Sequence, residues 1–159
     1  QLIMKLKKLR LDLDGIHEYQ QNRDPYLLIE VAEEVIPGES ARGYKDLTIN
    51  DWWFKVHFPG DPNMPGALQM EAMVQLGALM VTTLPGNKGK TVYLTSANLR
   101  LIKKVIPGNR LEIETELLSW KRGVGECSAS GYVKGEKVCS LIFNIVMPHI
   151  LAEYQVLKK

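Results

Sequence analysis

The sequence is poor in cysteine, and this scarcity limits its redox chemistry. Its only two cysteines, Cys127 and Cys139, flank the segment VKGEK, which is typical of a tight hairpin turn. If residues 135 and 136 form the turn, Cys139 faces Tyr132 and Cys127 faces Asn144, so the sulfurs lie about 16 Å apart along the strands. A disulfide cannot span that distance, and free thiols indicate a reducing compartment, the cytoplasm.

Long apolar runs and metal-ligand clusters are also missing. No apolar stretch reaches about 18 residues, which argues against a transmembrane helix and a membrane partner. The N-terminus, QLIMKLKKLRLDLD, is too often interrupted by charges for a signal-peptide core, and Met4 is a candidate native start. No CxxC motif or histidine cluster accompanies the cysteines, so we expect no metal site.

A strong excess of one charge is absent as well. Lys and Arg number 20 against 18 Asp and Glu, which gives a net charge of +2. This surplus is too small to indicate a nucleic-acid partner. It is compatible with a local basic patch that faces an acidic partner.

The chain has enough apolar residues, 45%, for one domain of 159 residues. Its patterns predict a short helix, two strands, a long helix and four strands, over residues 12–21, 26–36, 39–49, 66–83, 91–105, 110–120, 125–135 and 137–147. The long helix is apolar almost all round, so a sheet must cover it. The predicted class is α+β, with an antiparallel six-stranded sheet wrapped around one buried helix. We treat residues 1–159 as a single domain, with an N-terminal extension over 1–15 and a C-terminal tail over 148–159.

One segment, VHFPGDPNMPGALQMEAMVQ (residues 56–75), places a histidine and a carboxylate in unusual settings. Prolines and glycines fix its loop up to Pro65 and Gly66, where the long helix begins. The first N–H groups of a helix have no helical partner and can bind an anion or a developing oxyanion. A rigid turn that merely precedes a helix explains these residues equally well.

Glu71 lies about 7.5 Å along the helix axis from Gly66, on the same face as Gln75 and Ala78. Glutamate is rarely buried unless paired, and two interpretations are open. One is a hydrogen-bonded Glu71–Gln75 pair at the helix surface, and the other is a carboxyl group with a raised pKa in an apolar pocket. His57 lies in the loop that leads into this helix. A base, a carboxyl group and free backbone donors are the components of proton abstraction beside a carbonyl.

The segment HFPGDPNMPGALQMEAMVQ resembles the motif of 3-hydroxyacyl-[acyl-carrier-protein] dehydratases of the FabZ type. The likeness extends through DPYLLIEV, IPGESARGYKDLTINDWWF and NLRLIKKVIPGNRLEIETEL, and it spans residues 16–147. The chain departs from the family at Val56, where glycine is usual, and at Asn109, where aspartate is usual. GDPNMPG is closer to the FabA dehydratase–isomerases, but these carry Asp where this chain has Glu71.

The resemblance implies a hot-dog fold and a homodimer or trimer of dimers, with each active site at a dimer interface. His57 would be the catalytic base of one subunit and Glu71 the catalytic acid of the other, while the Gly66 N–H binds the thioester carbonyl. The implied reaction is dehydration of (3R)-hydroxyacyl thioesters to trans-2-enoyl thioesters, in fatty acid or related acyl or polyketide synthesis, without a cofactor. Candidates for substrate contacts are Phe58, Met64, Pro65, Leu68, Met73 and Gln75.

The partner implied by the resemblance is acyl carrier protein, which is acidic. We therefore expect it to dock on basic residues, namely Arg100, Lys103 and Lys104, with Arg110, Lys121 and Arg122 as further candidates. Two other functions are open. A hot-dog thioesterase would use the helix acid without the His-Phe-Pro-Gly loop, and a non-catalytic acyl-binding module would need neither His57 nor Glu71.

Overall fold

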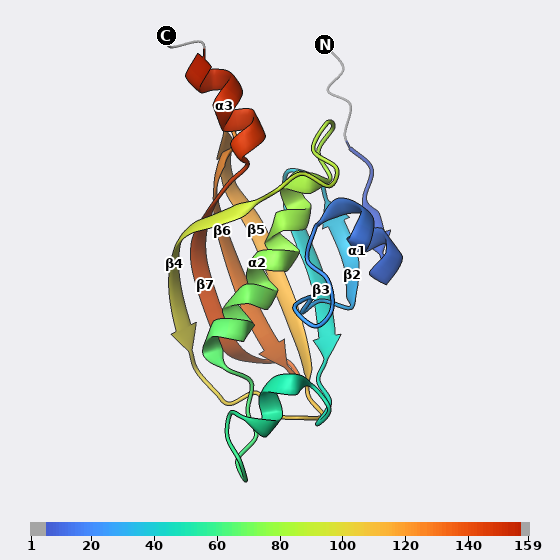
Figure 1. Cartoon of the computed structure of the whole chain (residues 1–159), viewed down its shortest axis with the longest axis vertical. Helices are drawn as coiled ribbons and strands as arrows, with labels where there is room; N and C mark the ends of the chain where they lie inside the picture. The colour runs from blue at the N-terminus through green and yellow to red at the C-terminus, as the bar shows by residue number, and fades with distance from the viewer. Residues whose placement is uncertain (1–5, 157–159) are drawn as a thin grey trace.

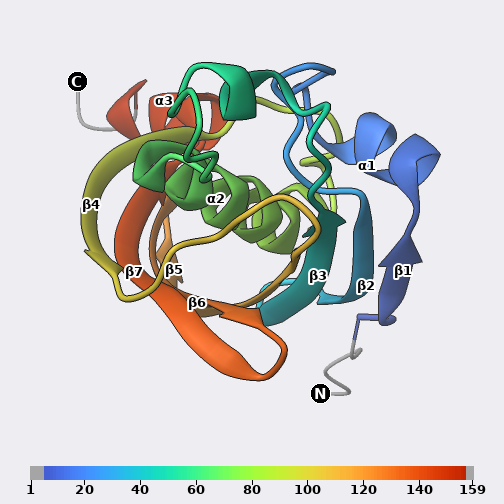
Figure 2. The same ribbon diagram turned by 90° about the horizontal axis from the view of Figure 1, so that it is seen from below.

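The computed structural model describes residues 6–156, which form one antiparallel sheet curved around a central helix (Figure 1, Figure 2). Within these residues the sheet has seven strands in the order β1-β2-β3-β5-β6-β7-β4. They are β1 (Leu9–Leu11), β2 (Val31–Ile36), β3 (Ser40–Asp46), β4 (Tyr93–Leu101), β5 (Arg110–Lys121), β6 (Val124–Val133) and β7 (Glu136–Val146). The helices are α1 (Leu13–Tyr19), α2 (Gly66–Thr82) and α3 (Pro148–Val156), with a 3-10 turn, η1 (Trp52–Lys55). The predicted α+β class is confirmed, and the expectation for Met4 lies outside the described residues.

The sheet has one strand more than the six predicted. The additional strand, β1, is three residues long and pairs antiparallel with β2. So short a segment carries no periodic signal of its own, because its pairing depends on a strand about twenty residues further along the chain. β2 also begins five residues later than predicted, at Val31. Before it, Leu28 donates its N–H to the side chain of Gln75 in α2 rather than to a neighbouring strand.

Helix α2 is the buried axis of the fold, and its bounds agree with the prediction to within one residue. Thirteen of its 17 residues are buried, on every face, so the sheet and the α1 region must cover it. Gly77 allows its closest approach to the sheet, because a Cβ there would lie 2.7 Å from Cζ of Phe143 in β7. Among the described residues, no helix has the length and apolar character needed to cross a membrane.

The hairpin between β6 and β7 turns one residue earlier than predicted. Lys134 and Gly135 form the turn with φ angles of 50° and 79°, which suits the right-handed twist of the two strands. Cys139 therefore faces Gly131, and Cys127 faces Phe143. Both thiols are free, as predicted, and both are buried. Burial raises the pKa of Cys127 to about 12.

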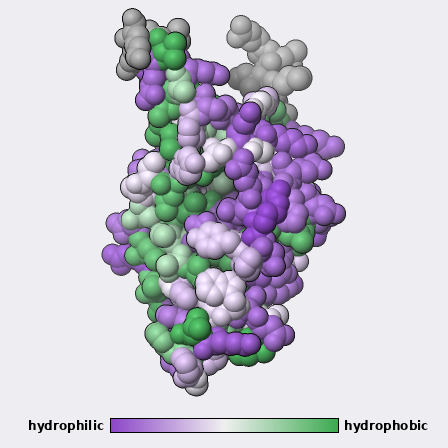
Figure 3. Space-filling model, viewed as in Figure 1, coloured by the Kyte–Doolittle hydropathy of each residue, from purple (hydrophilic) through white to green (hydrophobic). Residues whose placement is uncertain are grey.

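Strand β4 leaves one edge of the sheet open. It is the last strand in the order and bonds only to β7. Its side chains are largely exposed, including those of Tyr93 and Leu101 at its two ends. On the face seen in Figure 3, apolar side chains gather on the β4 side and hydrophilic ones on the side of α1 and β2. A long exposed edge of this kind is suited to pairing with a strand of another chain.

Candidate active site

His57 lies in a tight loop between η1 and α2. This loop is closed by hydrogen bonds between its own backbone groups. The N–H groups of Phe58 and Asp61 each donate to the other residue's carbonyl over 2.9 Å, and Asn63 donates to the His57 carbonyl. Gly60 has a φ of +80°, a conformation that favours glycine. The loop is therefore specified by its own residues, as the prolines and glycines of the sequence predict.

The imidazole of His57 is held in one tautomer. Its Nδ1 lies 3.0 Å from the carbonyl oxygen of Asn63. Because a carbonyl oxygen only accepts hydrogen bonds, Nδ1 carries a proton, and in the neutral ring Nε2 keeps its lone pair. The ring is half-buried and packs on Phe58, with 4.0 Å between ring centroids. A neutral imidazole with a free Nε2 is suited to accept a proton.

Gly66, the first residue of α2, fits closely against Leu101 of β4. A Cβ at position 66 would lie 2.3 Å from Cδ1 of Leu101, so a larger residue requires movement. Within residues 6–156, the N–H of Gly66 donates to no backbone or side-chain acceptor. The dipole of the helix adds positive potential at this point. Gly66 therefore presents a free donor suited to an oxyanion.

Glu71 is half-buried in α2, and burial raises the pKa of its carboxyl group above the ordinary value of 4.5. A hydrogen bond from the Gln75 amide opposes this shift. The pKa of Tyr26 is also raised, mainly by burial and to a lesser extent by the negative charge of Glu71. Glu71 is therefore paired with Gln75, as in the first interpretation, but the pair is not at the helix surface, and burial raises the pKa of Glu71, as in the second. A carboxyl group with a raised pKa is suited to donate a proton.

Gln75 connects this carboxyl group to the segment before β2. Its Nε2 donates to Oε1 of Glu71 over 3.2 Å and to the carbonyl of Tyr26 over 2.8 Å. Its Oε1 accepts the N–H of Leu28, also over 2.8 Å. The side chain is buried, and its three bonds fix both the Glu71 carboxylate and the path of the chain leading into β2.

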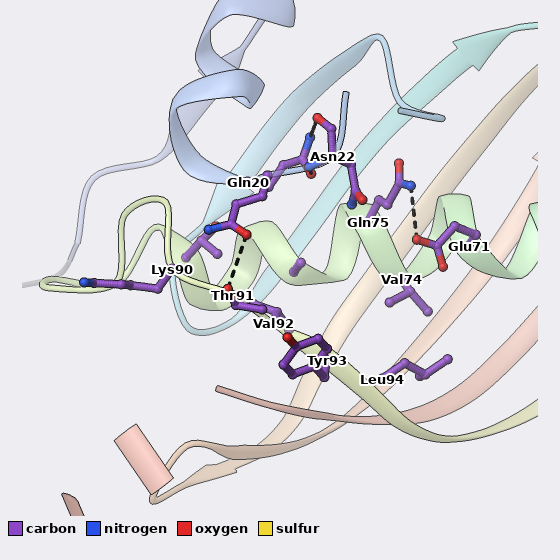
Figure 4. A pocket seen from close by; sticks show the side chains of 13 residues that line it. Gln20, Asn22, Glu71, Val74, Gln75, Lys90, Thr91, Val92, Tyr93 and Leu94 are labelled. Carbon is purple, nitrogen blue, oxygen red and sulfur yellow. Dashed lines mark hydrogen bonds between the residues drawn. The ribbon is translucent and has the colours of Figure 1, made fainter. Parts of the chain in front are cut away.

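Glu71 and Gln75 line a cavity of about 410 Å³ along one face of α2 (Figure 4). The cavity lies between this helix, the start of β4 and the segment that follows α1. Its wall on α2 is formed by Glu71, Val74, Gln75, Ala78 and Thr82. The volume is in the range of sites that hold small molecules. The residues described contain no group of three or more His, Cys, Asp or Glu placed to hold a metal ion.

The base and the acid predicted from the sequence do not share this cavity within one chain. Glu71 lines it, whereas His57 does not. Of the predicted substrate contacts, Gln75 lines it. The others lie elsewhere: Met64, Leu68 and Met73 are buried in the core, Phe58 is exposed in the loop, and Pro65 is the N-cap of α2.

Several cavity residues were not identified from the sequence. Val74 and Thr82 follow Glu71 at spacings of three and eleven residues, so the helical period that links Glu71 to Gln75 and Ala78 could have found them. The other walls come from Gln20–Asn22 and Lys90–Leu94. They carry no such signal, because only the tertiary fold brings them to α2.

The predicted docking residues are already partly neutralised. Lys103 pairs with Glu136 over 2.6 Å, and Lys104 pairs with Asp61 of the His57 loop over 2.9 Å. Arg100 is exposed on β4 and forms no ion pair within residues 6–156. All these groups are exposed, so each pair contributes little to stability.

The two departures from the family pattern have local explanations. Val56 is exposed and has φ −112° and ψ −10°, which any residue adopts without strain. Glycine is therefore not required before His57. Asn109 uses its Oδ1 to accept the N–H of Ile106 over 2.9 Å, a role that an aspartate carboxylate fills equally well.

The fold and this site match one protein family. The FabA-like domain matches residues 22–142, and the chain therefore belongs to the FabA-like family. Among solved structures, the dehydratase heterocomplex ApeI:P from Xenorhabdus doucetiae has a TM-score of 0.73 and 16% identity, and covers 91% of this chain and 97% of that one. At such low identity this likeness concerns the fold alone.

Curated relatives narrow the assignment within the family. The chain is 42% identical over 137 residues to the 3-hydroxyacyl-[acyl-carrier-protein] dehydratase FabZ of Caldicellulosiruptor saccharolyticus, which covers 84% of this chain and 98% of that protein. It is 39% identical over 140 residues to the enzyme of the same name from Clostridium novyi, covering 86% and 99%. Within the FabA-like family the chain is of the FabZ type, which agrees with the resemblance of its loop–helix motif.

Proposed function

We propose that the protein is a hydro-lyase that dehydrates (3R)-hydroxyacyl thioesters on acyl carrier protein to trans-2-enoyl thioesters, in fatty acid biosynthesis. The observation that carries this proposal is that the chain holds two groups suited to proton transfer, a base and an acid. His57 has a free Nε2, because its Nδ1 donates to Asn63. Glu71 has a raised pKa and lines a cavity. The FabZ relatives carry the same activity in their names.

The first step is removal of the C2 proton by Nε2 of His57. As the proton leaves, negative charge develops on the thioester oxygen. The free N–H of Gly66 then donates to that oxygen, with support from the helix dipole. The bond from Nδ1 to the Asn63 carbonyl stabilises the imidazolium that forms, because this bond persists when both ring nitrogens are protonated.

The second step is loss of the 3-hydroxyl group as water. A hydroxide ion is a poor leaving group, so the oxygen must receive a proton as the bond to C3 breaks. Glu71 supplies this proton, since burial favours its neutral form. Gln75 orients the carboxyl group by donating to Oε1. In the reverse direction the same two residues add water to the enoyl thioester.

The active site is completed by a second copy of the chain, which brings its His57 to the Glu71 of the first. Two observations support this arrangement. His57 is absent from the lining of the Glu71 cavity, and β4 has a free, exposed edge beside that cavity. Pairing of two β4 edges would place the His57 loop of each chain against the Glu71 cavity of the other chain. The assembly is then a homodimer, or a trimer of such dimers.

Acyl carrier protein docks on the basic side chains of Arg100, Lys103 and Lys104. Arg100 is free to bind a carboxylate of the carrier. Lys103 and Lys104 must first break their ion pairs with Glu136 and Asp61. These exposed pairs are weak, so the exchange costs little. The two buried free thiols support a reducing compartment, the cytoplasm.

The decisive measurement is the absorbance of the enoyl thioester when the purified protein meets crotonyl- or 3-hydroxyacyl-carrier substrates. We expect reversible hydration that is lost in His57→Ala and Glu71→Gln. Full activity of both variants, or no reaction of the unmodified protein, contradicts the proposal. Release of free carrier thiol identifies a thioesterase instead.

A further inference from the structure

A depression of about 270 Å³ lies between the segment that joins β4 to β5 and the hairpin of β6 and β7 (Figure 2). Backbone hydrogen bonds hold these two segments together. The N–H groups of Ile102 and Lys103 both donate to the carbonyl of Val138 in β7, over 2.8 and 3.3 Å. The depression shares no lining residue with the Glu71 cavity, so it is a separate feature of the surface.

Three lysines line this depression, and we call them the lysine cluster: Lys103, Lys104 and Lys134. The first two are docking residues predicted from the sequence. Lys134 was not identified there, because only the β6–β7 hairpin brings it to the other two. It is exposed and forms no ion pair within residues 6–156. The cluster adjoins the His57 loop, since Lys104 pairs with Asp61 of that loop.

The same depression also has an apolar lining. Ile106, in the turn before β5, is 46% exposed, and Val133, at the end of β6, is partly buried. A small anion would need only the lysines. Apolar contacts within a charged rim are instead typical of a protein–protein interface. The depression therefore fits an acidic protein that presents an apolar side chain among its carboxylates.

Two carboxylates of the chain itself already occupy part of the lysine cluster. Glu136 accepts a hydrogen bond from Lys103 over 2.6 Å, and Asp61 binds Lys104 through both oxygens, over 2.9 and 3.1 Å. The cluster and these two groups carry three positive and two negative charges, a net charge of +1. Their attraction for an acidic partner is therefore weaker than that of three unpaired lysines.

We propose that Glu136 and Asp61 compete with the acyl carrier protein for the lysine cluster and so limit how tightly it docks. The inference rests on the proposed function, in which an acidic carrier binds these lysines, and it adds Lys134 to the docking surface. In the free protein the two internal carboxylates take the places of carboxylates of the carrier. When the carrier leaves, they return to the lysines, which shortens the lifetime of the complex and favours release of the product.

The test compares the crotonyl thioester of purified acyl carrier protein with that of pantetheine, which lacks the protein. The readout is the ratio of kcat/KM for the two substrates, since changes in the chemical step cancel in it. Glu136→Gln keeps the shape and releases Lys103, so this ratio should rise about two- to fivefold, the range for an exposed ion pair. Asp61→Asn should raise it similarly through Lys104. An unchanged or lower ratio in either variant overturns the proposal.

A double variant shows whether Glu136 acts by occupying Lys103. Lys103→Met has no ammonium group to release at this position. Addition of Glu136→Gln to Lys103→Met should therefore give little or no further gain in the ratio, and the two substitutions are not additive. A gain as large as that in the unmodified protein would mean that Glu136 acts through its charge alone, and this result contradicts the competition.

Two controls test the place of the effect. Glu126→Gln removes an exposed carboxylate that forms no ion pair within residues 6–156 and lies about 23 Å along β6 from Val133, so the ratio should stay unchanged. Lys134→Met should lower the ratio about two- to fivefold. Lys137→Met removes a charge of the same hairpin outside the depression and should lower it less. An equal fall in the two lysine variants contradicts the role given to Lys134.

The unmodified protein distinguishes failure of this inference from failure of the proposed function. Absence of hydration with both crotonyl thioesters contradicts the proposed function itself. Hydration of both thioesters, with the same ratio in the unmodified protein and in Glu136→Gln, contradicts only the competition for the lysine cluster.

Discussion

The amide of Gln75 donates to Oε1 of Glu71 over 3.2 Å and cannot be turned round. Its own oxygen accepts a backbone N–H, from Leu28, and its nitrogen donates to a backbone carbonyl, that of Tyr26. Neither backbone group can exchange its role. Oε1 of Glu71 therefore always accepts a hydrogen bond, and when the carboxyl group is protonated, Oε2 is the oxygen that carries the proton. The two oxygens of this carboxyl group have different tasks before any substrate binds.

Replacement of Gln75 by leucine should destabilise the protein by about 2–4 kcal/mol, because it leaves the Leu28 N–H and the Tyr26 carbonyl without their partner. Urea denaturation measures the change in the free energy of unfolding. Gln155→Leu, on the exposed face of α3, is the control and should change it by no more than about 0.5 kcal/mol. A loss for Gln75→Leu no larger than that of the control contradicts the role given to this side chain.

Glu71→Gln should become more stable relative to the unmodified protein as pH rises. Burial raises the pKa of Glu71 in the folded state, so the folded protein holds this proton more tightly than the unfolded chain. The resulting loss of stability is absent below the unfolded pKa, grows as pH rises, and is complete above the folded pKa. Thermal unfolding of both proteins between about pH 4 and pH 8 measures the difference in Tm. A difference independent of pH contradicts the raised pKa.

Gly66→Ala should cost about 1 kcal/mol, the lower end of the range for overpacking, because the Leu101 side chain that it meets is exposed and can move. The added Cβ would lie 2.3 Å from Cδ1 of Leu101, so the Leu101 side chain or the helix start must move. Leu101→Ala in the same chain removes that atom and should recover part of the loss. A double-mutant cycle of unfolding free energies measures the coupling. Additive effects of the two substitutions would show that the contact is not the cause.

Two inactive variants should restore activity when mixed. If each site takes His57 from one chain and Glu71 from another, a dimer of His57→Ala with Glu71→Gln contains one intact site. Random mixing after subunit exchange gives about one quarter of the activity of the unmodified protein. Enoyl thioester absorbance measures the recovery, with each variant alone as the control. No recovery, with mixed dimers demonstrated by mass, contradicts a site shared between subunits.

The sequence predicts the long helix and most strands because their signals are local. The long apolar run of α2 and the turn residues IPGN (106–109) and KRGV (121–124) are sufficient to identify them. β1 forms only because it pairs with β2, and the start of β2 depends on the hydrogen bond between the Leu28 N–H and the Gln75 side chain. Neither feature can be predicted from a single segment of the sequence. The hairpin register depends on whether Lys134 accepts a positive φ, which glycine-based reasoning does not anticipate.

The candidate site likewise contains residues that the sequence predicts and residues that only the fold brings together. His57, Gly66 and Glu71 lie within one motif, and the helical period adds Gln75 and Ala78. The opposite walls of the cavity come from residues 20–22 and 90–94, which reach α2 only in the folded chain. The separation of His57 from the Glu71 cavity is likewise a property of the fold. No spacing along the sequence specifies it.

The His57 loop has two attachments to the segment after β4, and salt acts on only one of them. Asp61 at the tip is held by the exposed ammonium of Lys104, an interaction that ions screen. Met64 at the base donates its N–H to the carbonyl of Val105 over 2.7 Å, which ionic strength leaves unchanged. Concentrated salt should therefore loosen the tip of the loop while its base, and with it the orientation of His57, stays in place.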